Sequence, residues 1–238
     1  MIRDTVFFDL DGTLLPLDMD AYVAKFLELL SKLDFSELEG KAFNEDVLNK
    51  AFQDMISSKH PDKTNETAYF DSIEKHTNIK RKAVEPIFID FYQNHFHKLK
   101  FASNREPAAR KVIDILKSKG YKIVLATNPL FPKIATKTRL GWAGLSEDDF
   151  SYITTFDNSC FSKPHLEYYL EILDKLTLDA KSCYMVGNNI EEDLCAIKLG
   201  FKAFLLTDHI IGDIRKAPEC EKGNYLDLIN WAESLPKI

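Results

Sequence analysis

The sequence predicts an α/β protein with a parallel three-layer core and a block of helices inserted after the first strand. The first observation is that, in the second half of the chain, short apolar runs alternate with helix-like segments, as in βαβ units. The second is that none of the nine glycines falls between Gly40 and Gly120. A long glycine-free segment with helical periodicity favours packed helices over a β domain, which needs tight turns.

The expected first strand is the apolar run at residues 5–9, which ends in an aspartate. In residues 18–33 the apolar side chains recur at i, i+3, i+4 and i+7, the spacing of one helix face. The pattern Ser36-x-x-Glu39 is typical of a capping box and predicts the start of a second helix. The first strand is therefore followed by helices rather than by another strand.

Two further helices complete the block. A polar loop precedes residues 66–76, and Asn65 is the expected N-cap of a helix there. The fourth helix is predicted over residues 81–98, and Pro86 lies either in its first turn or at a kink. Three aromatic residues of this helix are expected to pack in the interior of the block: Phe88, Phe91 and Tyr92.

The rest of the chain alternates between helices and strands. Residues 107–119 are predicted to form a helix, because a proline begins the segment and Gly120 follows it. Residues 123–126 are continuously apolar, as in a parallel strand buried on both faces. The remaining helix and strand pairs are expected at 133–140 and 152–155, at 164–176 and 183–186, and at 190–199 and 201–206.

Composition and charge exclude several classes of function. The chain has 238 residues, of which 45% are hydrophobic, and its formal net charge is −6 with no basic block. We therefore expect neither a nucleic-acid partner nor a membrane partner. The chain begins without the apolar block of a signal peptide, and its four cysteines are dispersed, which favours isolated thiols in a reducing cytoplasm. A monomer or a homodimer is expected.

Polar residues follow the expected strands at the points where those strands end. In parallel α/β sheets, ligands bind outside the carboxyl ends of the strands, so these residues are predicted to converge at one edge of the sheet. The convergence would gather acids, a hydroxyl, an ammonium and amides. The segments are Asp9-Leu10-Asp11-Gly12-Thr13, Thr127-Asn128, Lys163 before the next helix, and Asn188-Asn189 with Asp193.

In the order and placing of these four segments the sequence resembles the haloacid dehalogenase superfamily, specifically its phosphatase branch. Asp9-x-Asp11-Gly12-Thr13 is the most specific of them, because it ends an apolar strand close to the start of the chain. The resemblance implies a Rossmann-like core domain at residues 1–16 and 99–238. It also implies a helical cap domain at residues 17–98.

The resemblance implies a role for each catalytic position. Asp9 would attack phosphorus and form an aspartyl-phosphate, and Asp11 would protonate the leaving oxygen and then activate water. Thr127 would hydrogen-bond a phosphoryl oxygen, and Lys163 would supply positive charge to the nucleophile and to the transferring group.

A Mg²⁺ ion is the implied cofactor, with Asp9, Asp11, Asn188, Asn189 and Asp193 as candidate ligands. One departure from the family pattern concerns the fourth segment. Relatives usually place an acid four or five residues before the last aspartate, where this chain has Asn189 and Asn188. An amide oxygen adds no negative charge, so we expect a high Mg²⁺ requirement.

The function predicted first is a Mg²⁺-dependent phosphatase that hydrolyses a small phosphorylated metabolite. The expected substrate-binding residues are Gly12, Thr13, Asn128, Lys63 and Asn65, of which the last two lie in the polar loop of the cap. Two alternatives remain open. One is a phosphomutase of the same superfamily, and the other is a homologue that binds phosphorylated ligands without catalysis.

Overall fold

The computed structural model describes residues 3–35, 38, 43–57 and 59–238, and these residues form one parallel sheet of six strands. Its strand order is β3-β2-β1-β4-β5-β6, so the chain starts in the middle of the sheet and extends it in both directions. This confirms the predicted α/β fold. The strands are β1 (Thr5–Phe8), β2 (Lys122–Leu125), β3 (Tyr152–Ile153), β4 (Cys183–Gly187), β5 (Lys202–Leu206) and β6 (Glu221–Gly223).

Helices cover both faces of the sheet, which explains why its central strands are apolar throughout. Phe8 and its neighbours of the same face pack against α5 (Pro107–Ser118) and α8 (Tyr225–Ser234). Phe7 and the opposite face pack against α7 (Leu166–Leu176) and the 3₁₀ helix η5 (Leu194–Leu199). Because side chains alternate along a strand, neighbouring residues of β1 enter different halves of the core.

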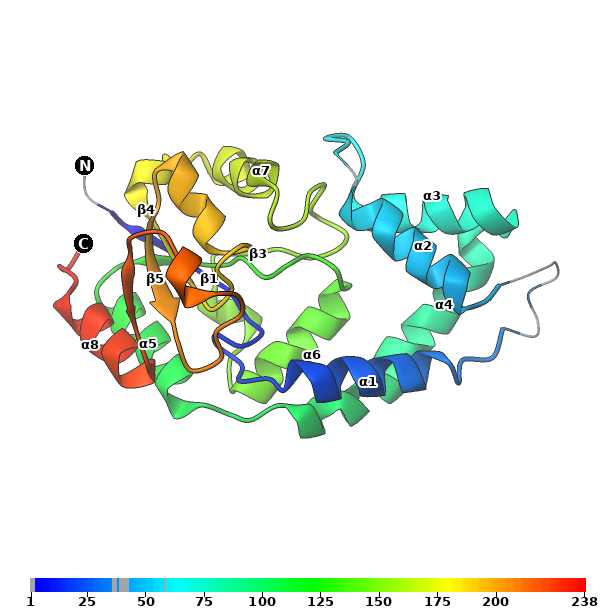
Figure 1. Cartoon of the computed structure of the whole chain (residues 1–238), viewed down its shortest axis with the longest axis horizontal. Coiled ribbons are helices and arrows are strands. Elements are labelled where there is room, and N and C mark those ends of the chain that lie inside the picture. The colour runs from blue at the N-terminus through cyan, green and yellow to red at the C-terminus, as the bar shows by residue number, and fades with distance from the viewer. Residues whose placement is uncertain (1–2, 36–37, 39–42, 58) are drawn as a thin grey trace.

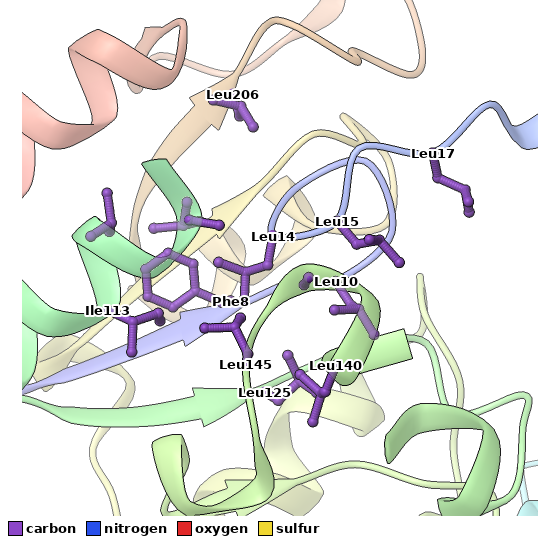
Figure 2. Close-up of a cluster of buried hydrophobic side chains, with 14 of the residues drawn as sticks. Phe8, Leu10, Leu14, Leu15, Leu17, Ile113, Leu125, Leu140, Leu145 and Leu206 are labelled. Atoms are coloured by element: carbon purple, nitrogen blue, oxygen red, sulfur yellow. The ribbon is translucent and has the colours of Figure 1, made fainter. Parts of the chain in front are cut away.

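The turn after β1 is held by packing as well as by hydrogen bonds. Leu10, Leu14 and Leu15 are fully buried and join the cluster that contains Phe8 (Figure 2). Backbone hydrogen bonds from Thr13 and Leu15 to the Leu10 carbonyl, of 3.1 and 2.8 Å, close the turn. The segment that carries the first predicted motif is therefore anchored to the core.

The segment between β1 and α5 is helical, and its helices α1–α4 extend from one end of the sheet (Figure 1). We call residues 17–98 the helical insert. Its helices are α1 (Met19–Leu30), α2 (Glu45–Ile56), α3 (Asn65–Thr77), α4 (Arg81–Asp90), a π-helical turn η1 (Phe91–His95) and the 3₁₀ helix η2 (Phe96–Ala102), which runs past its end.

Several expected details of these helices differ from the structure. Ser36 and Glu39 lie outside the described residues, and α2 begins later, with Asn44 as its N-cap. Thr64 rather than Asn65 caps α3, because the Thr64 side chain accepts the hydrogen bond from the Thr67 amide. Of the two positions left open for the proline of the fourth helix, the structure has it inside α4, beyond the first turn.

The chain leaves and re-enters the core at one place. Leu17 and Ser103 form an antiparallel bridge, and the Asp18 amide donates to the Ala102 carbonyl at 2.8 Å. Asn104 completes the pairing by donating to the Pro16 carbonyl at 3.1 Å. We propose that this paired crossing is the boundary of the helical insert, which moves its second end from residue 98 to about Ser103.

The C-terminal part of the core contains elements that the sequence did not suggest, namely β6 and α8. Over residues 190–199, where a helix was predicted, only the 3₁₀ helix η5 forms, preceded by turns. Each of the four cysteines is free. No helix in the described part of the chain has the length and apolar character needed to cross a membrane. The remaining helices are α6 (Lys133–Ala143), η3 (Glu147–Asp149), η4 (Ala180–Ser182) and η6 (Ile214–Lys216).

A largely buried ion pair joins two elements of the core. Arg110 of α5 donates two hydrogen bonds to Asp149, of 2.7 and 2.9 Å, and Lys117 adds a third of 3.0 Å. The Ser146 amide donates to the same carboxylate at 2.9 Å. Burial by itself raises the pKa of Asp149, but these donors outweigh it and hold the pKa below its usual value.

We predict that Asp149→Asn lowers the free energy of unfolding by about 2 kcal/mol at pH 7, because it removes charge-assisted hydrogen bonds. A carboxyl group with a depressed folded-state pKa stabilises the fold above its unfolded pKa of about 3.9 and loses that contribution as pH falls. Urea unfolding at pH 7 and near pH 3 should therefore show the difference shrinking in acid. Asp114→Asn is the control, since Asp114 also pairs with Arg110 but is 63% exposed. Equal losses for both variants would contradict the prediction.

Candidate functional site

A buried ammonium joins three loops at the carboxyl edge of the sheet. The Nζ atom of Lys163 lies 2.9 Å from Asp9 Oδ1 and 2.6 Å from Asp193 Oδ1, and its side chain is fully buried. Asp9 directly follows β1, Asp193 follows β4, and Lys163 precedes α7. Burial by itself lowers the pKa of Lys163, but the carboxylates of Asp193 and Asp9 raise it well above its usual value. The lysine therefore carries a positive charge.

The hydroxyl of Thr13 lies between the second oxygen of Asp9 and the side chain of Asn188. The Thr13 hydroxyl lies 3.3 Å from Asp9 Oδ2 and 3.0 Å from the amide oxygen of Asn188. Asn188 is fixed in turn, since its Nδ2 donates to the His209 carbonyl at 2.6 Å. Gly12 has a φ of +84°, and a Cβ atom there would lie 2.2 Å from Asn188 Nδ2. Glycine is required at this position for its backbone conformation and for lack of space.

Asp11 has a different environment from Asp9. One of its oxygens pairs with the guanidinium of Arg139 from α6, and the other is buried without a hydrogen-bond partner among the described residues. Arg139 is 1% exposed and also lies over the Phe131 ring, 4.8 Å from its centroid. Burial raises the pKa of Asp11, Arg139 opposes the shift and Asp9 adds to it, and the result is above the usual value.

Asn128 links the second and third predicted segments. Its Oδ1 accepts a hydrogen bond of 3.2 Å from the Lys163 amide, and its Nδ2 donates to Glu192 at 3.1 Å. Thr127 is buried, and its carbonyl accepts from the hydroxyls of Thr154 and Tyr168 at 2.7 and 2.9 Å. These contacts fix the loop after β2 beside the loops that carry Asp9 and Asp193.

The two asparagines of the fourth segment differ in position. The Asn189 side chain accepts hydrogen bonds from the amides of Glu191 and Glu192, at 3.0 and 3.1 Å, and so shapes its own turn. Asp193 also has both oxygens engaged, one by Lys163 and the other by the Asn189 amide at 2.9 Å. Of the two amides, Asn188 is the one that the hydroxyl of Thr13 connects to Asp9.

The polar loop of the helical insert does not supply the expected substrate contacts. Lys63 forms an ion pair of 2.7 Å with Asp71, and both side chains are exposed. Asn65 is fully buried and donates to the Pro129 carbonyl at 3.1 Å, so it attaches α3 to the core. Neither residue lines the cavity between the core and the helical insert. Their expected role in specificity gains no support from this placement, because one side chain faces solvent and the other is an anchor.

A cavity of about 550 Å³ opens between the core and the helical insert. Its core side includes six of the residues predicted from the ends of the strands: Asp9, Asp11, Thr127, Asn128, Asn188 and Asn189. Its other side is formed by residues of α1–α4. A ligand in this cavity contacts both parts of the protein at once.

The sequence prediction missed three residues around this site. Arg139 lies within α6, Glu192 borders the cavity next to Asn128, and Tyr22 of α1 has a buried hydroxyl without a partner among the described residues. No sequence signal marks Arg139 or Tyr22, since each lies in the middle of a helix. Glu192 could have been found, because it lies in the segment that carries Asp193.

The oxygen-rich face of the cavity fits a hard divalent cation. Asp9 supplies a carboxylate and Asn188 supplies an amide oxygen. Across the described residues no group of three or more His, Cys, Asp or Glu side chains is arranged to hold a metal. A cation here would therefore be held by few acidic groups.

Comparisons with known proteins agree with this geometry. The family model of haloacid dehalogenase-like hydrolases matches residues 3–200, so the chain belongs to that family. It is 27% identical to glyceraldehyde 3-phosphate phosphatase from Methanothermobacter thermautotrophicus over 86% of each protein. It is 25% identical to the probable phosphatase IndB of Dickeya dadantii, over 100% of this chain and 96% of that protein.

The fold is also shared with solved structures. The crystal structure of a HAD phosphatase from Thermococcus onnurineus aligns with a TM-score of 0.58 and 18% identity, covering 99% of this chain and 100% of that one. Family and relatives together identify the chain as a hydrolase that acts on phosphate esters.

We predict that Asp11 and Arg139 are energetically coupled. Asp11→Asn and Arg139→Met should each destabilise the protein, because each removes one partner of a buried, hydrogen-bonded pair. The double variant should recover about 2 kcal/mol relative to the sum of the single losses, as measured by urea unfolding without added metal. Arg139→Met combined with Asp149→Asn is the additive control, since these residues share no partner. Additivity of the Asp11 pair within about 0.5 kcal/mol would contradict the coupling.

Proposed function

We propose that this protein is a Mg²⁺-dependent phosphatase that hydrolyses a small phosphate monoester through an aspartyl-phosphate on Asp9. The observation that carries the proposal is the position of Asp9 at the cavity wall, with its two oxygens held by Lys163 and Thr13. A carboxylate fixed in this way is aimed at its target rather than free to rotate. The similarity to two phosphatase relatives supports the same reaction class.

Asp9 and Asp11 have different roles in the proposed reaction. Asp9 attacks phosphorus, which forms the bond to its carboxylate oxygen and breaks the bond between phosphorus and the ester oxygen. Asp11, whose burial favours the protonated form, gives its proton to that departing oxygen. Once deprotonated, Asp11 takes a proton from the water that cleaves the acyl phosphate and releases inorganic phosphate. Lys163 offsets negative charge on Asp9 and on the transferring group.

Mg²⁺ is part of the proposal, and members of the family generally use it. Asp9, the backbone carbonyl of Asp11 and Asn188 would hold the ion, which when bound neutralises charge on the phosphoryl oxygens. Asn189 and Asp193 have other partners, and we propose that they shape the loop rather than ligate the ion directly. Thr127 and Asn128 remain the proposed contacts for the phosphoryl oxygens from the loop after β2.

We predict release of inorganic phosphate from p-nitrophenyl phosphate in Mg²⁺, and loss of that release in EDTA. Asp9→Asn should reduce turnover to background, because the amide is not a nucleophile at phosphorus. Asp11→Asn should lower kcat by about 10² to 10⁴-fold, because the proton donor is lost. Asp208→Asn serves as a control, since Asp208 accepts a hydrogen bond from the Tyr225 amide and does not line the cavity.

The same assay separates the alternatives. Full activity of Asp9→Asn would overturn the mechanism. No phosphate release at high Mg²⁺, combined with binding of a phosphorylated ligand, would identify a binding protein instead. Accumulation of a bisphosphate with slow release of phosphate would identify a phosphomutase.

We predict that Asn188→Asp increases Mg²⁺ affinity by at least about tenfold. An added unit charge about 4 Å from the ion is worth on the order of 4 kcal/mol at an effective dielectric of 20, and loss of the His209 contact offsets part of it. Asn189→Asp is the matched control and should change the affinity little, because its side chain faces its own backbone. Calorimetric titration with Mg²⁺ in the absence of substrate measures both. A larger gain for Asn189→Asp would reverse the assignment.

A further inference from the structure

The cavity changes character along its length. Its polar end carries the aspartates and amides described above, whereas the part inside the helical insert is lined almost entirely by hydrocarbon and aromatic side chains. These come from four helices that converge on the same space. Representative residues are Phe26 of α1, Phe52 and Met55 of α2, Phe70 of α3 and Phe88 of α4.

Of the three aromatic residues that were expected to pack in the interior of the insert, two also line the cavity. Phe88 and Tyr92 line the cavity, while Phe91 is fully buried and packs against Phe26 and Phe96. Phe88 also packs edge-on against Phe70. The cavity wall is therefore part of an interlocked aromatic cluster, which gives it a fixed shape rather than a collapsible one.

The apolar part of the cavity offers almost nothing to a polar leaving group. Among the described residues that line the cavity none is a lysine or an arginine. Its charged groups within the insert are Glu66 and Glu85, and both pair with Arg81, at 2.9 and 2.6 Å. A second phosphate or carboxylate would meet no free cation there. Sugar hydroxyls would lose water and find few hydrogen-bonding groups in return, mainly the hydroxyls of Tyr22, Tyr69 and Tyr92 and the amide of Asn49.

We propose that the substrate is the phosphate monoester of an apolar alcohol, with the phosphoryl group at Asp9 and the hydrocarbon part within the helical insert. This inference rests on the proposed phosphatase function and names the substrate class. The cavity of about 550 Å³ is in the range of pockets that enclose small ligands. Transfer of a hydrocarbon chain from water into it is favourable in proportion to the apolar area buried.

The residues at the rim of the cavity also favour a substrate with a hydrocarbon part. Val23 and Leu27 of α1 and Ile89 of α4 line the cavity although they are 44%, 41% and 48% exposed. Large apolar side chains that face both water and a cavity gain burial when a hydrocarbon ligand covers them. The polar loop with Lys63 lies away from this rim, so the apolar helices, not that loop, would select the substrate.

The test is a series of unbranched alkyl phosphates from ethyl to octyl, compared with glycerol phosphate. We expect kcat/KM to rise about threefold for each added methylene until the cavity is filled. Leu27→Gln and Ile89→Gln should each lower kcat/KM for octyl phosphate by about tenfold while changing that for ethyl phosphate little. Leu226→Gln is the matched control, because Leu226 is 65% exposed on α8 and lies outside the cavity.

The outcomes of this test distinguish failure of the proposed substrate class from failure of the proposed phosphatase function. A flat series, or a preference for glycerol phosphate, with Asp9-dependent hydrolysis of p-nitrophenyl phosphate overturns the substrate class and leaves the phosphatase. An unchanged ratio of kcat/KM for octyl phosphate to that for ethyl phosphate in both rim variants overturns the placement of the hydrocarbon. Absence of hydrolysis for every ester overturns the phosphatase, and this inference with it.

Discussion

A cation is costly to remove from water unless carboxylates and hydrogen bonds replace its hydration, and the ammonium of Lys163 is fully buried. Its partners, Asp9 and Asp193, come from loops after two adjacent strands of the sheet. The three groups therefore have to stay together for any of them to be buried. This requirement determines where the loops lie and orients the carboxylate of Asp9 toward the cavity.

Two aspartates only two residues apart acquire different properties from their neighbours. Asp9 is held by two donors, the ammonium of Lys163 and the hydroxyl of Thr13. Asp11 keeps one oxygen without a partner, and its burial favours the protonated form in spite of Arg139. Two carboxyl groups in such different environments suit a nucleophile and an acid within one site.

The sheet and most of the polar edge could be predicted because apolar strands and the groups at their ends are local in sequence. The side chains that contact these groups could not be predicted, because those contacts depend on tertiary packing. Arg139 contacts Asp11 from the middle of α6, where no local sequence pattern distinguishes it from a surface arginine. The two asparagines of the fourth segment were indistinguishable until their hydrogen bonds separated them. Strand β6 is short and largely exposed, so no apolar run marks it.

The helical insert contributes most of the apolar wall of the cavity, and the core contributes the aspartates and amides, so the proposed recognition and chemistry reside in different parts of the chain. The central claim concerns the core side of the cavity, where Asp9 forms a covalent intermediate. Rapid acid quench during turnover, followed by mass spectrometry of the peptide that contains Asp9, tests it most directly. We expect the mass of one phosphoryl group on Asp9 and none on Asp11. Steady release of phosphate without a phosphorylated Asp9 at any time, or with the label on another residue, would contradict the account.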